Sequence, residues 1–529
     1  MGNIISALAG VAKSIKSIIS AFRSISADYN ALLARVNSPA GLPVDSPTES
    51  YWFDQPPFPE LVNAQSPVFP EEADVVIIGS GITGAAVART ILHEWRRKGE
   101  DDNKRVVVLE ARQICSGATG RNGGHIKASP HEMVGRLQKK MSPDRAASLV
   151  RFQLRHLETL VGLCSAESID VAECREVETV DYYVEESLYE EAVKQIEYLR
   201  KWVPEFKMTA WTASEAQKRF SVNHFVVGAI SYKAGALWPY RFVTSIWKSL
   251  LNEFPEKLSI ETHTPVSTVT STPDSEFPLD VTTNRGVIRS RHVVHATNAF
   301  ASHLVPGFRG KMTSLLAHMS AQRPGKNFPD HNGQRSWSVI YGNGFDYATQ
   351  RPTTAGVPGD IMIGGGFGQS KKQGLDQLGV YDDSKIDALT AAHILGIMPT
   401  IFESNWAGDI DGRAKKVWTG VVALTADFLP FVGRLDPRLT GRKATKSSRA
   451  GQSQAGEWTA AGFVGDGMVW AWLSGTALGV MIAGSEDEDL PTAPGRPAGR
   501  LRDWFPDELL PTHERIKRMD VADLADGII

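Results

Sequence analysis

Residues 75–84 read V-V-I-I-G-S-G-I-T-G, a short apolar run that enters a glycine-rich turn. The glycines match the pattern G-x-G-x-x-G, and residues 82–97 have the periodicity of a helix. A second apolar run at residues 106–109 ends at Glu110. This order predicts a βαβ unit of the Rossmann type, with the pyrophosphate of a dinucleotide at the N-terminus of the helix.

The residues of this turn have separate physical roles. Gly79 allows the tight turn, Gly81 lets the backbone approach the pyrophosphate, and Gly84 lets the helix pack closely on the strand. Glu110 is expected to accept hydrogen bonds from the adenosine ribose. It lies 26 residues after Gly84, more than the usual spacing of about 20, and the polar turn at residues 99–104 accounts for the difference. A purely structural glycine turn is the alternative.

A second small-residue loop indicates which dinucleotide binds. Residues 115–125 read C-S-G-A-T-G-R-N-G-G-H, directly after the strand that carries Glu110. A nicotinamide dehydrogenase has no need of a second glycine-rich loop there. FAD does, because its pyrophosphate and isoalloxazine both require close approach of the backbone. The loop therefore favours FAD.

This loop resembles the S-G-A-[ST]-G-R-N-G-G segment of the D-amino-acid-oxidase (DAO) superfamily of FAD-dependent oxidoreductases. The sequence is similar in particular to the γ-glutamylputrescine oxidase and sarcosine oxidase-like branch. Other segments resemble the family in the same order, across residues 72–485: V-V-H-A-T-N-A at 293–299, W-T-G at 418–420, D-F-L-P-F-V-G at 427–433, A-G-F-V-G-D-G-M at 461–468 and S-G-T-A-L at 474–478.

The resemblance implies a mixed α/β (α+β) fold, with a Rossmann-type FAD-binding domain and a second, antiparallel-sheet substrate domain. We expect the FAD-binding domain at residues 72–130, 232–305 and 412–485, and the substrate domain at 131–231 and 306–411. The expected cofactor contacts are Gly79, Ser80, Gly81, Ile82, Thr83, Gly84, Glu110, Ala111, Arg112, Ser116, Thr119, Arg121, Asn122, Gly123, Gly124, Ala296, Gly465, Gly467 and Met468.

The chain departs from the family pattern in the C-terminal turn, where Asp466 replaces a histidine and would place a carboxylate near the flavin edge. Asp466 could instead cap the helix that follows. The last third of the chain has no cysteine, so a cysteinyl-flavin link cannot form there. We expect non-covalent FAD. His125 could act as a base or as a hydrogen-bond donor to the ring, and a structural histidine is the alternative.

Residues 347–352 read Y-A-T-Q-R-P and resemble the family's strand beside the substrate pocket. Tyr347 or Arg351 could bind a substrate carboxylate, with arginine favoured by its two-pronged geometry. The alternative is that Arg351 pairs with a structural acid and that Tyr347 is packed in the core.

The resemblance implies oxidation of a C–N bond in an amine or amino acid. A hydride passes to flavin N5, and the resulting imine hydrolyses. Oxygen or another acceptor would reoxidise the flavin. Two alternatives remain: oxidation of a C–OH or C–C bond in a specialised metabolite, and a membrane-tethered, non-catalytic protein with a flavin-binding fold.

Composition narrows the class of protein further. The 529 residues carry a net charge of -3, which gives no reason to expect nucleic acid as a partner. The three cysteines form no C-x-x-C pair, which argues against a zinc site or a disulfide scaffold and fits a reducing compartment. We expect no bound metal and an intracellular, cytoplasmic location.

The two ends of the chain have their own patterns. Residues 1–6 read M-G-N-I-I-S and match the N-myristoylation pattern at Gly2, and residues 1–36 have the periodicity of an amphipathic helix. Together they suggest peripheral contact with a membrane surface; a helix that packs on the body or on a second copy is the alternative. Residues 37–71 are a proline-rich arm, and we expect residues 486–529 to be a peripheral tail.

Overall fold

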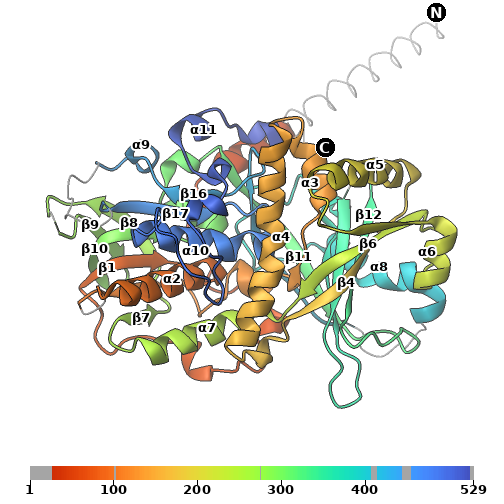
Figure 1. The fold of residues 1–529 in the computed structure, drawn as a ribbon, viewed down its shortest axis with the longest axis horizontal. Helices are drawn as coiled ribbons and strands as arrows, with labels where there is room; N and C mark the ends of the chain where they lie inside the picture. The colour runs from red at the N-terminus through yellow and green to blue at the C-terminus, as the bar shows by residue number, and fades with distance from the viewer. Residues whose placement is uncertain are drawn as a thin grey trace, which may run out of the picture.

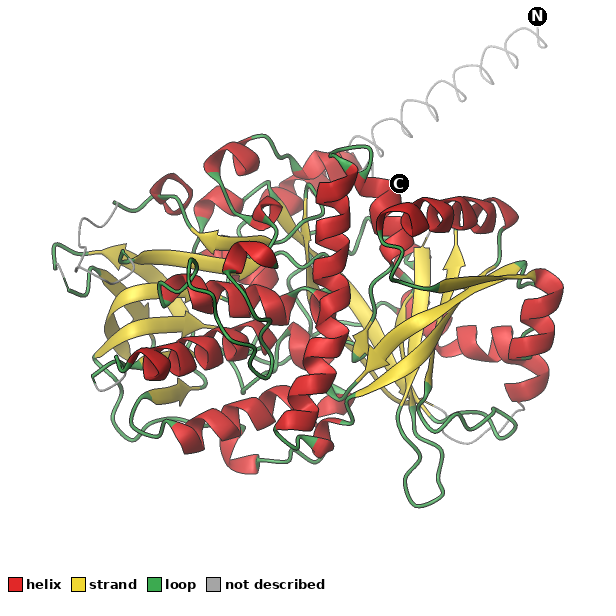
Figure 2. Ribbon diagram, viewed as in Figure 1, coloured by secondary structure: helices red, strands yellow, loops and turns green. Residues whose placement is uncertain are grey.

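The computed structural model describes residues 27–100, 103–274, 276–342, 344–406, 414–443 and 454–524. Two sheets form the centres of two halves, and helix α4 (Pro143–Ala166) runs between them (Figures 1 and 2). The acylation pattern and most of the expected amphipathic helix fall on residues 1–26, outside the described residues; residues 27–37 are helical. Within the described ranges, no helix has both the length and the hydropathy needed to cross a bilayer.

The first sheet is the predicted βαβ unit with additions. β1 pairs in parallel with β2 on one side and with β10 on the other, and β10 pairs in parallel with β17. The path order is β16-β17-β10-β1-β2-β7, with β9 beside β10 and β8 beside β9. The strands are β1 (Glu72–Ile78), β2 (Val106–Leu109), β7 (Leu258–Glu261), β8 (Val266–Ser271), β9 (Leu279–Thr283), β10 (Gly286–His295), β16 (Phe431–Arg434) and β17 (Gly456–Ala461).

Two helices that are distant in sequence pack together on this sheet. Helix α2 (Ile82–Lys98) follows β1, and helix α10 (Ala471–Ile482) lies against it. A Cβ at Gly475 would lie 2.7 Å from the Thr83 carbonyl oxygen, and one at Gly479 would lie 2.6 Å from Thr90 Cβ. Glycine at these positions therefore allows the helices to approach closely. Helix α7 (Pro239–Glu253) also contacts α2.

The second sheet has order β15-β11-β14-β13-β12-β4-β6-β3, with β5 beside β6. Its chief helices are α3 (Pro130–Leu137), α5 (Glu186–Trp202), α6 (Ala213–Phe220) and α8 (Ala388–Trp406). The strands are β3 (His125–Ile126), β4 (Arg175–Tyr183), β5 (Met208–Thr212), β6 (Gly228–Ala236), β11 (Met312–Gln322), β12 (Arg335–Tyr341), β13 (Gly344–Gln350), β14 (Ile361–Gly365) and β15 (Ala414–Thr425).

Alternation along the strands gives the second sheet two different faces. Val180, Trp337 and Ile363 pack in one apolar cluster with Met398 and Phe402 of α8. Asp181 follows Val180 and Tyr347 precedes Ala348 of the same cluster, so both point to the opposite face. That face carries the polar side chains described below.

Three expected boundaries differ from the sheets of the structure. β3 lies within 72–130, residues 232–236 of β6 within 232–305 and β15 within 412–485, all assigned to the FAD-binding domain, but these strands belong to the second sheet. The reason is antiparallel pairing, of β6 with β3 and β4 and of β15 with β11. The expected peripheral tail also packs: Trp504, Phe505 and Leu509 are buried in the main core cluster.

Candidate active site

The glycine turn after β1 requires glycine for steric reasons. Gly79 has φ +110°, and a Cβ there would lie 2.7 Å from the Ala296 carbonyl oxygen. A Cβ at Gly84 would lie 2.1 Å from the Gly79 carbonyl oxygen. Helix α2 begins after Gly81 without a side-chain cap. The turn thus presents backbone N–H groups and the positive end of a helix dipole, which suit a pyrophosphate.

Glu110 lies beside this turn, at the end of β2. Ser80 Oγ donates to Glu110 Oε2 at 2.6 Å, and the Arg112 backbone N–H donates to Oε1 at 3.1 Å. The Ser80 backbone N–H also donates to Oε2, at 3.2 Å. A carboxylate can accept about four hydrogen bonds, so about one acceptor position remains for a ribose. Thr119 Oγ1 accepts from the Ile82 backbone N–H at 3.1 Å. This contact brings the second glycine-rich loop to the N-terminus of α2.

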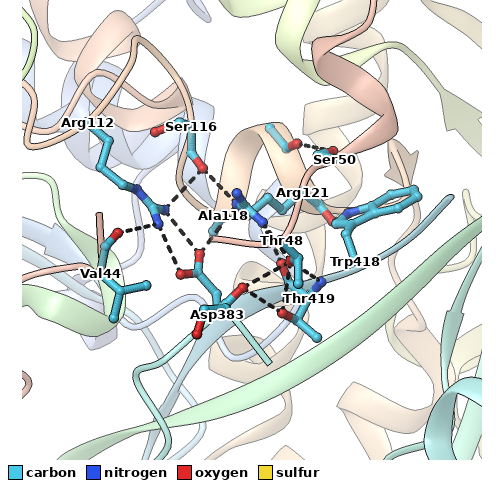
Figure 3. Close-up of polar contacts among 12 residues, drawn as sticks. Val44, Thr48, Ser50, Arg112, Ser116, Ala118, Arg121, Asp383, Trp418 and Thr419 are labelled. Atoms are coloured by element: carbon cyan, nitrogen blue, oxygen red, sulfur yellow. Dashed lines mark hydrogen bonds and ion pairs between the residues drawn. The ribbon is translucent and has the colours of Figure 1, made fainter. Parts of the chain in front are cut away.

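The two arginines expected to contact the cofactor, Arg112 and Arg121, share a carboxylate partner in the protein. Figure 3 shows Asp383 next to the guanidinium groups of Arg112 and Arg121, and its carboxylate lies 3.0 Å from Arg112 Nη1 and 3.4 Å from Arg121 Nε. Burial lowers the pKa of Arg121 to about 10. Arg121 Nη2 is buried without a hydrogen-bond partner among the described residues, and contact of either guanidinium with the cofactor stays a prediction. Both charges are buried, and a buried charge needs a partner.

Several features of the site fit an extended dinucleotide. Ser116 Oγ is buried in the second loop, and Thr297 Oγ1 is buried directly after Ala296; neither has a hydrogen-bond partner among the described residues. Near the C-terminal turn, a Cβ at Gly465 or Gly467 would meet nothing closer than 3.9 Å. The site thus has buried polar groups without a protein partner and glycines with free space beside them. Both features suit a bound FAD, which would supply partners for the polar groups.

Tyr347 of β13 lies against the second loop. A Cβ at Gly123 would lie 2.4 Å from its ring, and a Cβ at Gly364 would lie 2.8 Å from it, so two glycines form its slot. The hydroxyl accepts from the Gly123 backbone N–H at 3.2 Å, and burial raises the pKa of Tyr347 to about 12. The ring stacks on His125 at a centroid distance of 5.9 Å.

His125 lies near a set of polar contacts that the sequence did not reveal. Its Nε2 lies 2.9 Å from Ser336 Oγ, and burial with the nearby Lys127 charge lowers the pKa of His125 well below its usual value. Lys127 Nζ lies 2.5 Å from Asp181 Oδ1, and the Tyr232 hydroxyl donates to Asp181 Oδ2 at 2.7 Å. The sequence signal that could have pointed to Lys127 is its position two residues after His125, because alternate residues of an extended segment lie on the same face.

Asp466 lies in the C-terminal turn, where charged side chains of α3 act on its carboxyl group. Its side chain is exposed, yet the protein crowded around it raises its pKa to about 6. Arg136 of α3 counteracts this rise electrostatically, and Glu132 adds to it. The helix-cap alternative is not formed, because the Asp466 side chain makes no capping hydrogen bond to the turn that follows.

Arg351, a candidate for binding a substrate carboxylate, is already paired. Its Nη2 and Nε donate to the two carboxylate oxygens of Glu173 at 2.6 and 3.2 Å, and its Nη1 donates to the Tyr51 hydroxyl at 2.8 Å. Glu173 thus occupies the pair of nitrogens, Nε and Nη2, that would bind a substrate carboxylate. The geometry therefore fits the alternative that Arg351 pairs with a structural acid.

Comparison with known proteins agrees with the fold and with these motifs. The family described as DAO, FAD dependent oxidoreductase, matches residues 74–479. The chain is also similar to "Probable oxidoreductase OrdL" of Haemophilus influenzae, at 24% identity over 255 residues. That match covers 47% of this chain and 54% of the relative, so the chain spans about half the length of this relative.

Solved structures share the fold at low identity. Glycine oxidase from Bacillus cereus has a TM-score of 0.58 at 16% identity, covering 78% of this chain and 95% of that one. Iminodiacetate oxidase from Chelativorans has a TM-score of 0.57 at 15% identity, with coverage of 79% and 97%. L-amino acid deaminase from Proteus vulgaris has a TM-score of 0.56 at 15% identity, with coverage of 82% and 96%. The family match extends over most of the sequence, and the chain therefore belongs to the DAO family of FAD-dependent oxidoreductases.

Proposed function

We propose that this enzyme oxidises the C–N bond of an amine or amino acid. The observation that carries the proposal is the family match over residues 74–479, together with Asp466, a carboxyl group in the C-terminal turn that interacts electrostatically with Arg136 and whose pKa is raised to about 6. An amine must be unprotonated before a hydride leaves its carbon, because the nitrogen lone pair forms the new C=N bond. A carboxylate that titrates near neutrality is suited to accept that proton.

FAD, when bound, supplies the hydride acceptor, N5 of its ring. The residues of the chain position the substrate and control its protonation. His125 is held neutral, so it can accept or donate one hydrogen bond without adding a positive charge that would repel an ammonium group. The Tyr347 hydroxyl stays protonated at neutral pH. The imine product would then hydrolyse in water, and the electrons would pass from the cofactor to oxygen or another acceptor.

Arg136 is our candidate for binding a substrate carboxylate, in place of Arg351. Its guanidinium lies 5.1 Å from the ring centroid of Phe428 and interacts electrostatically with Asp466. No ion pair within 4.0 Å involves Arg136 in the part of the chain that the structure describes. A substrate with an amine toward Asp466 and a carboxylate toward Arg136 is an amino acid. The names of the structural neighbours, which include glycine oxidase and L-amino acid deaminase, support that class.

An anaerobic titration tests this function. Flavin absorbance is recorded while amino acids and primary, secondary and N-methyl amines are added to the purified holoenzyme. We expect at least one of these compounds to bleach the flavin, and Asp466→Asn to slow the bleaching by about 10²-fold or more. Asp436→Asn, a change at a remote turn, serves as the control. Bleaching by alcohols alone would favour the C–OH alternative and contradict the proposal.

We also propose peripheral contact with a membrane through acylated Gly2 and the amphipathic periodicity of residues 1–36. The support is the sequence pattern alone. One acyl chain gives weak binding, and a basic amphipathic segment is the second signal that stable attachment needs.

A further inference from the structure

The proline-rich arm (residues 37–71) lies before the family match at residues 74–479 and contacts the second glycine-rich loop directly. Ser50 Oγ donates to the Gly120 carbonyl at 2.8 Å, and Trp52 Nε1 donates to the Asn122 carbonyl. Trp52 is 2% exposed, and its own carbonyl accepts from Trp238 Nε1 at 2.9 Å. The arm is therefore a packed part of the site rather than a linker.

Thr48 is the central residue of this contact. Its backbone N–H and its hydroxyl both donate to the Asp383 carbonyl, at 2.8 and 3.0 Å. The same hydroxyl oxygen accepts from the Thr419 backbone N–H at 2.9 Å and lies 3.3 Å from Arg121 Nη1 (Figure 3). One arm residue thus joins three segments that are far apart in the sequence.

Asp383 connects this junction to the loop. Its side chain is 2% exposed and pairs with Arg112 on one side and Arg121 on the other. Both arginines also donate to the Ser116 carbonyl, Arg121 Nε at 2.8 Å and Arg112 Nη2 at 3.2 Å. Trp418 Nε1 holds the other end of the loop by donating to the Arg121 carbonyl at 2.8 Å. Asp383 therefore sets the position of both arginines, and through them the position of Ser116.

The loop needs such external support because of its composition. Residues 116–124 include four glycines, and glycine loses more conformational freedom on ordering than any other residue. Both arginine charges are buried, and an unpaired buried charge is strongly unfavourable, so the loop depends on the Asp383 carboxylate and, through the Asp383 carbonyl, on Thr48 of the arm.

We propose that Thr48 and Asp383 are positioning residues for FAD: the arm and Asp383 hold residues 115–124 in the conformation that binds the cofactor. A segment outside the family match thereby sets the affinity for FAD. This role is independent of the substrate, so it holds whether the enzyme oxidises C–N or C–OH bonds.

The test compares FAD affinity with stability in the full-length chain. Apoprotein is prepared, FAD is titrated with fluorescence detection, and the thermal midpoint of the apoprotein is measured separately. Asp383→Asn is matched by Glu94→Gln, because Glu94 is also a buried carboxylate paired with two arginines, Arg97 and Arg496. Thr48→Val is matched by Thr244→Val, a buried threonine whose hydroxyl bonds within α7.

We expect Asp383→Asn to raise the dissociation constant of FAD by about tenfold or more, and Thr48→Val by about threefold to tenfold, in line with the loss of hydrogen bonds to charged or buried groups. The visible spectrum of the remaining bound flavin should also change. The matched controls should lower the thermal midpoint without altering affinity or spectrum. Unchanged affinity in Thr48→Val, or an equal loss of affinity in the controls, would overturn the proposal. If Asp383→Asn does not fold, Thr48→Val decides.

Discussion

Replacing Gly84 with alanine tests whether the glycine turn is shaped by steric contact. The added Cβ would lie 2.1 Å from the Gly79 carbonyl oxygen and 3.4 Å from Ile77 Cγ2. Because the first of these neighbours is backbone, it cannot rotate away as a side chain could. The turn that is expected to bind the pyrophosphate must therefore move relative to α2.

Overpacking of this kind costs about 1–3 kcal/mol. The higher helix propensity of alanine relative to glycine offsets about 1 kcal/mol of that cost. Because a contact of 2.1 Å with rigid backbone belongs at the upper end of the overpacking range, about 2–3 kcal/mol, we expect a net destabilisation of about 1–2 kcal/mol in the apoprotein. The holoenzyme should lose more, because displacement of the Gly79–Gly81 backbone also weakens FAD binding by about tenfold, or 1.4 kcal/mol.

Thermal unfolding of apoprotein and holoenzyme, followed by circular dichroism, measures both effects, and FAD titration measures the second directly. Gly162→Ala is the matched control, because Gly162 lies inside α4 and a Cβ there meets nothing within 4 Å. That change should be neutral or stabilise by up to about 1 kcal/mol. If Gly84→Ala behaves like Gly162→Ala, the steric account of the turn is wrong.

Other changes test single residues of the site. The rate of flavin reduction should rise with pH through about 6, because the Asp466 carboxyl must lose its proton to act as a base, and Asp466→Asn should abolish this inflection in the pH profile. Tyr347→Phe should lower affinity for FAD and stability by about 1 kcal/mol, since a backbone N–H loses its acceptor. Arg351→Gln should destabilise the fold by on the order of 3 kcal/mol by leaving Glu173 unpaired, with KM for substrate unchanged in steady-state assays. Gly2→Ala should move the protein to the soluble fraction of a cell that acylates proteins, and unchanged fractionation would remove the membrane hypothesis.

The sequence by itself predicted the βαβ unit closely. The expected strand at residues 106–109 matches β2, and the expected helix at 82–97 differs from α2 by one residue. Apolar periodicity and glycine geometry are properties of a short stretch, so a short stretch is enough to identify them. The family motifs likewise identified FAD, because each glycine-rich segment must let the backbone approach the same ligand.

Only the tertiary structure decided which charged groups are available for chemistry. Arg112 is paired with Asp383, 271 residues away, and Arg351 with Glu173, 178 residues away. The docking of the arm through Thr48 depends on equally distant partners. A buried charge is stabilised by whichever partner the fold brings within about 4 Å, and no local spacing encodes that partner. The sequence therefore determined the fold and the cofactor, whereas the three-dimensional packing gave the arginines, Lys127 and the arm their partners.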